Sequence, residues 1–282
     1  MKIKFIGVGS AFTTRQYFQS NLLITAGNGR NMLIDCGTDI RFSLSECLSI
    51  SENHVSDVID SVYVSHLHSD HIGGMEWLAF QSYFSQRPNR PGLFMEESTM
   101  YEMWDCSLKA GLGCIEGKQM HLTDYFRCNA VAGDGVFLWE GIFFTLVKMP
   151  HIITGYKNFY SYGLLIEEAG TDGKGCGEKF FFTTDTQFTR KLIMDVSDNV
   201  SVIFHDCETS PGKSMVHAHY NDLCTLPSEL KRKMWLYHYQ PDPVPRPEDD
   251  GFAGFVTKGQ EFVSHRTEQE KSTRRVSKTS KV

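Results

Sequence analysis

Six consecutive residues beginning at His66, HLHSDH, combine three histidines with one aspartate. Imidazole nitrogens and carboxylate oxygens are common ligands of transition-metal ions. The apolar segment SVYVS (61–65) directly precedes the first histidine and predicts a β-strand. At the end of that strand His66 and His68 can turn toward one point, and Asp70 and His71 can reach a second point beside it. This spacing predicts a loop that binds a pair of metal ions.

Short apolar segments between turn residues predict the elements that must position this loop. The first strands follow one another directly, and GNGR (27–30) predicts a hairpin turn between two of them. Later strands alternate with helices, so we expect two sheets packed together with helices on their outer faces. The predicted strands are 2–9, 20–27, 31–37, 61–65, 141–149, 160–168, 179–185, 200–206 and 233–239, and the predicted helices are 75–85, 188–195 and 217–232.

The composition is that of a globular protein, with 41% hydrophobic residues and a net charge of −6. The acidic balance disfavours binding of an extended nucleic acid. Eight cysteines without a CxxC pair predict reduced thiols in a cytoplasmic protein, and no segment resembles a signal peptide or a membrane span. Residues 265–282 almost lack large apolar side chains, which predicts a disordered basic tail.

The HLHSDH loop resembles the HxHxDH signature of the metallo-β-lactamase superfamily. The resemblance implies an α/β fold, an αββα sandwich that holds metal ions at one edge of its two sheets, and one hydrolase domain over residues 1–264. It also implies further ligands, each near the end of a predicted strand: His151 in VKMPHIITG, Asp185 in KFFFTTDT and His238 in KMWLYHYQ.

The implied ligands form two sets that share one carboxylate. Ligands without a thiolate favour two zinc ions, with manganese or iron as alternatives. Two such ions, about 3.5–4 Å apart, can activate water and oppose the charge on a phosphoryl group, so hydrolysis is the expected reaction. The first set is His66, His68 and His151, the second is Asp70, His71 and His238, and Asp185 belongs to both.

Two later segments, VSVIFHDCETS and SMVHAHYNDLCTLP, resemble the tRNase Z-like branch of this superfamily. The resemblance implies that His217 lies near the metals and protonates a leaving sugar oxygen, with His219 as the rival for this role. It further implies that His205 and Asp206 support the ligands by hydrogen bonds. Asp70, as a ligand of the second metal, and His217 are the predicted catalytic residues.

The interval 151–185 is too short for the arm with which tRNase Z binds tRNA, so a smaller phosphodiester is expected. From FIGVGSAF to GFAGFVTKGQEF the chain resembles the anti-Pycsar cyclic nucleotide phosphodiesterases. The resemblance implies a zinc-dependent cytoplasmic homodimer, in the host cytoplasm if phage-encoded, that hydrolyses cyclic CMP, UMP, AMP and GMP to nucleoside monophosphates, without a membrane partner. The alternatives are a tRNA 3′ endonuclease, another metallo-hydrolase such as a lactonase, and a non-enzymatic nucleotide sponge.

Residues 72–131 are additional sequence relative to tRNase Z, and we expect part of them to form a lid or a dimer contact. Arg87 and Arg90 lie near the start of this segment. Its aromatic residues Trp77, Phe80 and Phe84 have helical spacing, which predicts that they belong to the core rather than to the site.

Overall fold

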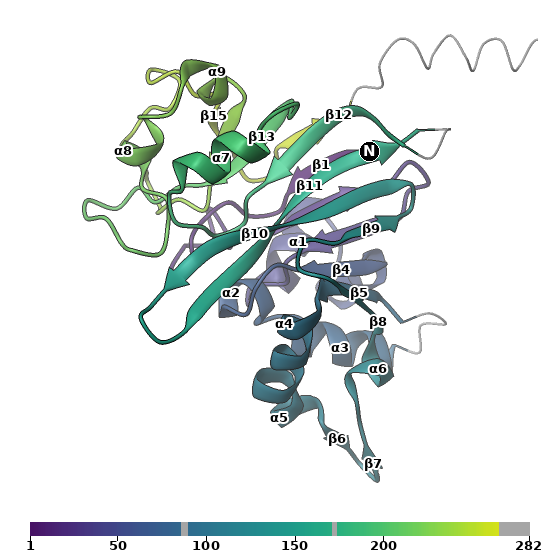
Figure 1. Ribbon diagram of the computed structural model, residues 1–282. Helices are drawn as coiled ribbons and strands as arrows, with labels where there is room; N and C mark the ends of the chain where they lie inside the picture. The colour runs from purple at the N-terminus through teal and green to yellow at the C-terminus, as the bar shows by residue number, and fades with distance from the viewer. Residues whose placement is uncertain (86–89, 171–173, 265–282) are drawn as a thin grey trace, which may run out of the picture.

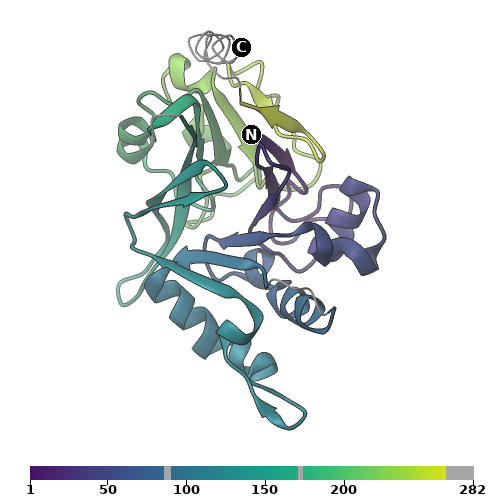
Figure 2. The same cartoon turned by 90° about the vertical axis from the view of Figure 1, so that its right-hand side faces the viewer.

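The computed structural model describes residues 1–85, 90–170 and 174–264. Within these ranges two seven-stranded sheets face each other, and helices cover their outer sides (Figure 2). This arrangement is the predicted αββα sandwich. The predicted tail, residues 265–282, and Arg87 lie outside the described residues.

The first sheet has the strand order β16-β1-β2-β3-β4-β5-β8. The β2–β3 connection is the predicted hairpin, in which Gly29 adopts a φ of +87° that favours glycine. Strands β3, β4, β5 and β8 run parallel, so their carboxyl ends lie at one edge. The bounds are β1 (Lys2–Phe5), β2 (Leu22–Thr25), β3 (Asn31–Ile34), β4 (Ser61–Val64), β5 (Gly92–Glu96), β8 (Arg127–Val131) and β16 (Glu261–Val263).

The second sheet has the order β15-β14-β13-β12-β11-β10-β9. Its long β10–β11 hairpin crosses the middle of Figure 1 and extends beyond the neighbouring strands. A separate hairpin of β6 (Cys114–Ile115) and β7 (Lys118–Gln119) projects away from the sandwich. The bounds are β9 (Val136–Trp139), β10 (Ile142–Ile153), β11 (Asn158–Ala169), β12 (Gly175–Phe182), β13 (Val202–Asp206), β14 (Met234–Tyr237) and β15 (Gly254–Phe255).

Alternation along the strands builds the core. Phe180 and Phe182 pack between the two sheets, whereas Phe181 belongs to the cluster under the outer helices. The ring of Phe204 meets Phe5 of the opposite sheet at a centroid distance of 5.0 Å. Burial of each such ring stabilises the sandwich by about 1.5–3 kcal/mol and holds the two sheets face to face.

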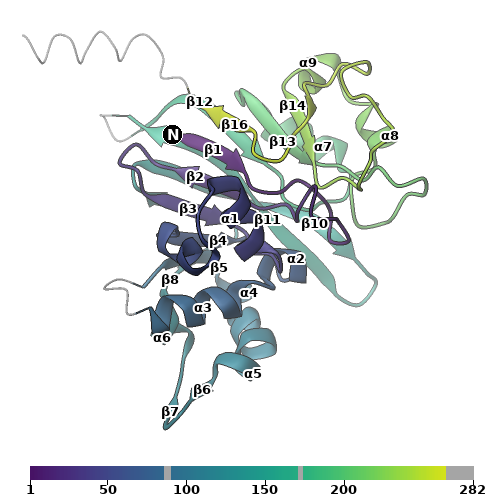
Figure 3. The ribbon, with the colours of Figure 1, turned by 180° about the vertical axis from the view of Figure 1, so that it is seen from behind.

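Two layers of short helices complete the sandwich (Figure 3). Helices α1 to α6 cover the first sheet, and α7 to α9 cover the second. No helix among the described residues combines the length and apolar character needed to cross a membrane. The bounds are α1 (Ile40–Leu48), η1 (Glu52–Val58), α2 (Ser69–Ile72), α3 (Met75–Phe84), α4 (Glu97–Met103), the π-helical turn η2 (Trp104–Leu108), α5 (Lys109–Leu112), α6 (Leu122–Tyr125), α7 (Arg190–Val196), α8 (Tyr220–Leu223) and α9 (Ser228–Lys231).

Two details of the expected helices are wrong. The helix predicted over 217–232 is two short helices, because Pro227 cannot continue the hydrogen bonding of α8. Phe84 lies in the last turn of α3 and is 62% exposed, so it is not a core residue, whereas Trp77 and Phe80 pack against the cluster beneath α3. The segment 72–131 supplies β5 and β8 of the first sheet as well as helices on its outer side.

Candidate metal centre

The predicted ligands meet at one edge of the sandwich, and both sheets contribute to them. His66 and its neighbours follow β4, Asp185 follows β12, and His238 follows β14. His151 lies within β10 at an irregularity of the β10–β11 pairing between Pro150 and Ile152. Such a bulge changes the direction of a side chain, which explains how a residue inside a long strand reaches the site.

Three imidazoles and one carboxylate form the first cluster. Nδ1 of His68 lies 3.1 Å from Nε2 of His66 and 3.0 Å from Nε2 of His151. Oδ2 of Asp185 lies 3.7 Å from Nε2 of His66 and 3.9 Å from Nε2 of His151. These four atoms lie close enough together to hold one metal ion, and four ligands are the number that zinc commonly takes.

The second cluster shares Asp185 with the first. Nε2 of His71 lies 3.3 Å from Oδ2 of Asp70 and 3.3 Å from Oδ2 of Asp185. Nε2 of His238 lies 3.3 Å and 3.5 Å from the same two oxygens. The structure therefore brings together all seven predicted ligands in two adjacent groups that could each hold a metal ion.

Protonation and hydrogen bonding both fit a bound cation. Burial lowers the pKa of His66 well below its usual value and that of His68 to about 4, so both imidazoles are neutral and have a free lone pair. Burial also lowers the pKa of His238, but the carboxylates of Asp185, Asp206 and Asp70 together outweigh it and raise that pKa to about 10, which shows how strongly this pocket attracts positive charge. Within the described residues, the buried Nε2 of His71 and Oδ1 of Asp185 have no hydrogen-bond partner.

Hydrogen bonds on the far side of the rings fix which nitrogen faces the centre. Nδ1 of His71 lies 2.8 Å from Oδ2 of Asp35, which also accepts from the hydroxyl of Ser65. Nδ1 of His151 lies 2.8 Å from the carbonyl oxygen of Val216. When Nδ1 carries the proton, Nε2 is left as the acceptor, and partners of this kind also hold the ring in place.

His217 lies beside the second cluster and is bonded to a buried carboxylate. Its Nδ1 is 2.8 Å from Oδ2 of Asp206, an atom that also accepts from the amide of Thr186. Oδ1 of Asp206 lies 3.4 Å from Nδ1 of His238. Burial lowers the pKa of His217, but Asp206 outweighs it, so the pKa is raised above its usual value. Its side chain is 19% exposed, so it is open to solvent.

The other two histidines of this region face elsewhere. Nε2 of His219 lies 3.0 Å from the carbonyl oxygen of Ser210, and its Nδ1 accepts from the amide of Asn221 at the start of α8. His205 is buried, and its Nδ1 contacts the backbone carbonyl of Asp206. Of the two residues predicted to support the ligands, Asp206 therefore contacts a ligand directly, whereas His205 contacts its neighbour's backbone.

Three participants were missed in the sequence. Asp35 ends the apolar segment NMLI as Asp185 ends KFFFTT, so a polar residue at a strand end was the available signal. The role of the Val216 carbonyl has no sequence signal, because every residue has a backbone carbonyl. Phe159 of β11 stacks on His68 with ring centroids 4.9 Å apart and forms an apolar wall beside the first cluster.

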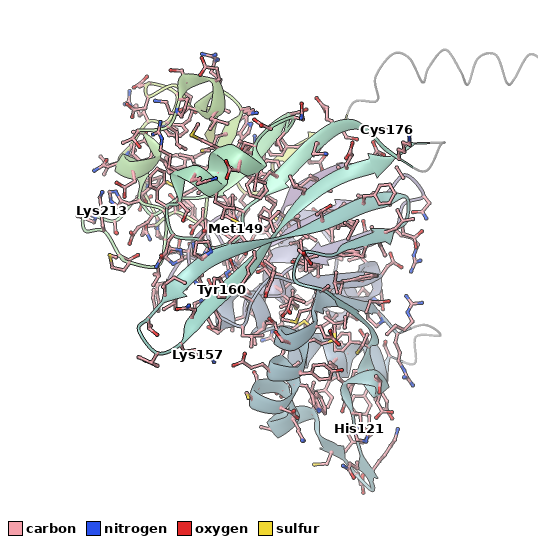
Figure 4. All side chains as sticks on the ribbon, in the orientation of Figure 1. His121, Met149, Lys157, Tyr160, Cys176 and Lys213 are labelled. Carbon is pink, nitrogen blue, oxygen red and sulfur yellow. The ribbon has the colours of Figure 1, made fainter. Side chains whose placement is uncertain are left out.

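Charged side chains lie on the loops that flank the site. Lys157, at the tip of the β10–β11 hairpin, and Lys213, on the loop before α8, lie on the left in Figure 4. Lys157 pairs with Glu102 of α4 at 2.8 Å, which joins the hairpin to the helical layer of the first sheet, and Lys213 pairs with Asp222 of α8. Arg90, from the expected lid segment, donates to the carbonyl of Thr123 instead.

Comparison with known structures identifies the fold. The protein YhfI from Bacillus subtilis, described as a metallo-β-lactamase fold protein, superimposes with a TM-score of 0.68 at 16% identity, covering 93% of this chain and 98% of YhfI. The short form of human tRNase Z gives a TM-score of 0.65 at 14% identity, covering 93% of this chain and 99% of that enzyme. The sandwich is therefore a metallo-β-lactamase fold.

Comparison of sequences identifies the family. The model of the family described as Anti-Pycsar protein Apyc1 matches residues 1–262. A protein of that description from Paenibacillus harenae is 32% identical over 243 residues, which are 85% of this chain and 90% of the relative. Another, from Bacillus phage vB_BsuM-Goe3, is 28% identical over 271 residues, 93% of this chain and 98% of the relative. The chain belongs to the Anti-Pycsar protein Apyc1 family.

Proposed function

We propose that this protein is a metal-dependent phosphodiesterase that opens 3′,5′-cyclic nucleotides to nucleoside monophosphates and thereby counteracts Pycsar-type antiviral signalling. The observation that carries the proposal is the pair of His/Asp clusters joined by Asp185, in a chain of the anti-Pycsar family. We propose His66, His68 and His151 as ligands of one metal ion, Asp70, His71 and His238 as ligands of the other, and Asp185 as the ligand of both.

Zinc is the proposed metal, with manganese or iron as alternatives, because the ligand atoms are nitrogen and oxygen without sulfur. When bound, two such ions would lower the pKa of water and oppose the negative charge of a phosphoryl group. The neutral imidazoles of His66 and His68 and the ionised Asp185 provide ligand atoms of the first cluster in the protonation states that metal binding requires.

His217 is the proposed proton donor. Asp206 occupies its Nδ1 and raises its pKa, which leaves Nε2 as the nitrogen that can donate outward. As the oxygen of a water molecule bonds to phosphorus, the water loses one proton to solvent, the bond from phosphorus to the sugar oxygen breaks, and that oxygen takes the proton of His217. His217 then regains a proton from solvent. General acid catalysis of this kind contributes about 10²–10⁴ in rate.

A compact substrate is favoured over tRNA. Between His151 and Asp185 the described residues are occupied by the end of β10 and by strands β11 and β12, which belong to the second sheet. The net charge of −6 provides no broad positive field for an extended polyanion. A cyclic nucleotide has a single negative charge on its phosphate and can be bound within the metal centre alone.

The test is a substrate panel with the metal-loaded protein. Cyclic CMP, UMP, AMP and GMP, a pre-tRNA and a lactone are incubated separately, and the products are resolved by chromatography. We expect nucleoside monophosphates from all four cyclic nucleotides and no product after chelation. Cleavage of the pre-tRNA alone indicates a tRNA endonuclease, hydrolysis of the lactone alone indicates a lactonase, and tight binding of an intact cyclic nucleotide indicates a sponge.

We further propose that the protein is cytoplasmic, since its proposed substrate is an intracellular signal. We also propose that it forms a homodimer. On the last strand of the second sheet, β9, Val136 and Leu138 are each 57% exposed, which provides an apolar surface for such a contact. Sedimentation velocity at micromolar protein concentration measures the mass directly. A species of one chain at all concentrations would contradict the dimer without affecting the proposed reaction.

A further inference from the structure

The loop between β13 and α8, residues 209–218, takes part in the site in two ways. Its Val216 carbonyl lies 2.8 Å from Nδ1 of His151, a proposed ligand of the first metal. The next residue, His217, is bonded to Asp206 beside the second cluster. A displacement of this short loop would therefore move the proton donor and release one ligand ring at the same time.

Glu208 stands at the base of this loop and fixes both of its ends. Its amide donates to the carbonyl of Ala218 at 2.8 Å, and its own carbonyl accepts from the amide of Tyr220 at 2.9 Å. These two backbone bonds close the loop in the manner of a strand pair. The loop ends are thus held by the backbone, and the residues between them need a separate support.

The carboxylate of Glu208 provides that support from within the loop. It accepts from the hydroxyl of Ser210 at 2.9 Å and from the amide of Ser214 at 2.8 Å. Only 5% of Glu208 is exposed, and among the described residues no cation lies within ion-pair distance of its carboxylate. Burial of a carboxylate is costly, so its stabilisation must come from these loop donors.

We propose that Glu208 is a positioning residue, which holds the loop 209–218 so that the Val216 carbonyl orients His151 and His217 faces the reacting phosphate. The proposal concerns the site of the proposed function and acts through it. Glu208 itself is buried and bonded to Ser210 and Ser214, so it transfers no proton to substrate. Its effect on turnover must therefore pass mainly through His217, and it must extend to metal binding at the first cluster.

The test compares Glu208→Ala with Glu208→Gln. Alanine removes both acceptors, and a displaced donor lowers kcat by about 100-fold with KM little changed. Glutamine preserves both contacts, because its carbonyl accepts from Ser214 and its amide group donates to the Ser210 hydroxyl. We expect Glu208→Gln to retain kcat within about threefold of the wild type. If the glutamine variant is as slow as the alanine variant, the charge itself acts and the proposal is overturned.

A double mutant separates positioning from an independent role. In the His217→Ala background, adding Glu208→Ala should cause only a small further loss of kcat, which comes from the freed His151 ring. A further loss of kcat of about 100-fold in that background contradicts the proposal. Glu96→Ala is the matched control, because Glu96 is 8% exposed and likewise accepts from one amide and from hydroxyls, at the start of α4. It should cost stability but leave kcat unchanged.

Two readouts do not depend on any substrate. Competition with a chelator should show that Glu208→Ala retains one metal about 10-fold less well, because the loss of the Val216 contact frees the His151 ring. Hydrogen exchange should show faster exchange at the amides of residues 212–217 in Glu208→Ala than in the wild type. Unchanged metal retention together with unchanged exchange overturns the proposal, even if no cyclic nucleotide is hydrolysed and the proposed function fails.

Discussion

At the scale of single residues, the surroundings shift the pKa values of the imidazoles at the site in opposite directions. Burial lowers the pKa of His66, His68 and His151, so these rings are neutral. His217 differs because Asp206 raises its pKa against the effect of burial. One edge of the sandwich therefore holds neutral imidazoles in the first cluster and, in His217 and His238, imidazoles whose pKa is raised by nearby carboxylates.

Replacement of His217 separates chemistry from metal binding. We expect His217→Ala to lower kcat by about 10²–10⁴ because only the proton donor is lost. Metal content, measured by elemental analysis, should remain that of the wild type. Asp70→Ala, in contrast, should lose the second metal and all turnover. A fully active His217→Ala beside an inactive His219→Ala would reverse the choice between these histidines, although the structure turns His219 toward Ser210.

Replacement of Asp35 tests the support of a ligand ring. Asp35→Asn presents an amide group in place of an oxygen that accepts from both His71 and Ser65, so the His71 ring loses its fixed orientation. We expect affinity for the second metal to fall about 10–100-fold, measured by competition with a fluorescent chelator. Asp60→Asn is the control, because Asp60 accepts from the amide of Asn31 outside the two ligand clusters. Equal affinities in both variants would contradict the role of Asp35.

At the scale of elements, helix α1 is preceded by an acidic residue whose carboxyl group is partly buried. Asp39 directly precedes the helix, and its Oδ2 accepts from the amide of Gln19 at 2.8 Å. Its Oδ1 is buried and has no hydrogen-bond partner among the described residues. Burial raises the pKa of this carboxyl to about 6, so the neutral form is the one that the folded protein favours. Ionisation at neutral pH consequently weakens the anchoring of α1.

The pH dependence of stability tests this conclusion. Because the pKa of Asp39 is raised by folding, its contribution is fully present below the unfolded pKa near 3.8 and is lost as pH rises through about 6. Asp39→Asn keeps an oxygen for Gln19 without the charge. We expect it to raise the free energy of unfolding by about 1–3 kcal/mol at pH 8, with most of the gain absent at pH 4.5, in urea titrations. Equal gains at both pH values would show that the charge is not the cause.

The sequence predicts those elements whose signal is local. HLHSDH could be recognised because its four candidate ligands lie within six consecutive residues that follow a strand, and the αββα sandwich could be recognised through the superfamily resemblance. The short helices α4, α5 and α6 and the strands β5 and β8 were not assigned, because few residues in each carry a periodic pattern. The helix predicted over 217–232 failed because Pro227 interrupts it, and the last-turn position of Phe84 explains its exposure.

The supporting contacts of the site could not be predicted because they join distant parts of the chain. The Val216 carbonyl that holds His151 is 65 residues away from it, and the backbone atom has no residue-specific signal. Asp35 lies 36 residues before His71 and could be found only through its place at a strand end. The choice between His217 and His219 required the direction of each ring, which depends on the turn before α8.

At the scale of the whole molecule, the two clusters connect the two sheets. His66 and Asp70 come from the first sheet, whereas His151, Asp185 and His238 come from the second. A bound cation would therefore add cross-links between layers that otherwise meet through their apolar core. Metal binding and global stability should be linked, since a ligand that binds only the folded state shifts the unfolding equilibrium.

Removal of metal tests this linkage. Each site occupied at 100 times its dissociation constant stabilises the fold by about 2.7 kcal/mol, so chelation should lower Tm by about 5 °C or more. Differential scanning fluorimetry with and without a chelator measures the change, and added zinc should restore it. Asp185→Asn, which lacks the shared ligand, should show a smaller change. A wild-type Tm that is insensitive to chelation would contradict the cross-linking role.

The contact between Asp70 and His238, whose facing atoms lie 3.3 Å apart, joins residues that are 168 positions apart in the chain. During synthesis on a ribosome, the histidine-rich loop emerges long before β14 can enter its sheet. A nascent chain therefore exposes residues 66–71 to cellular metal ions before the second half of the pocket has formed. The complete centre is the product of late folding, and a ribosome stalled before residue 238 would carry a chain that cannot yet close it.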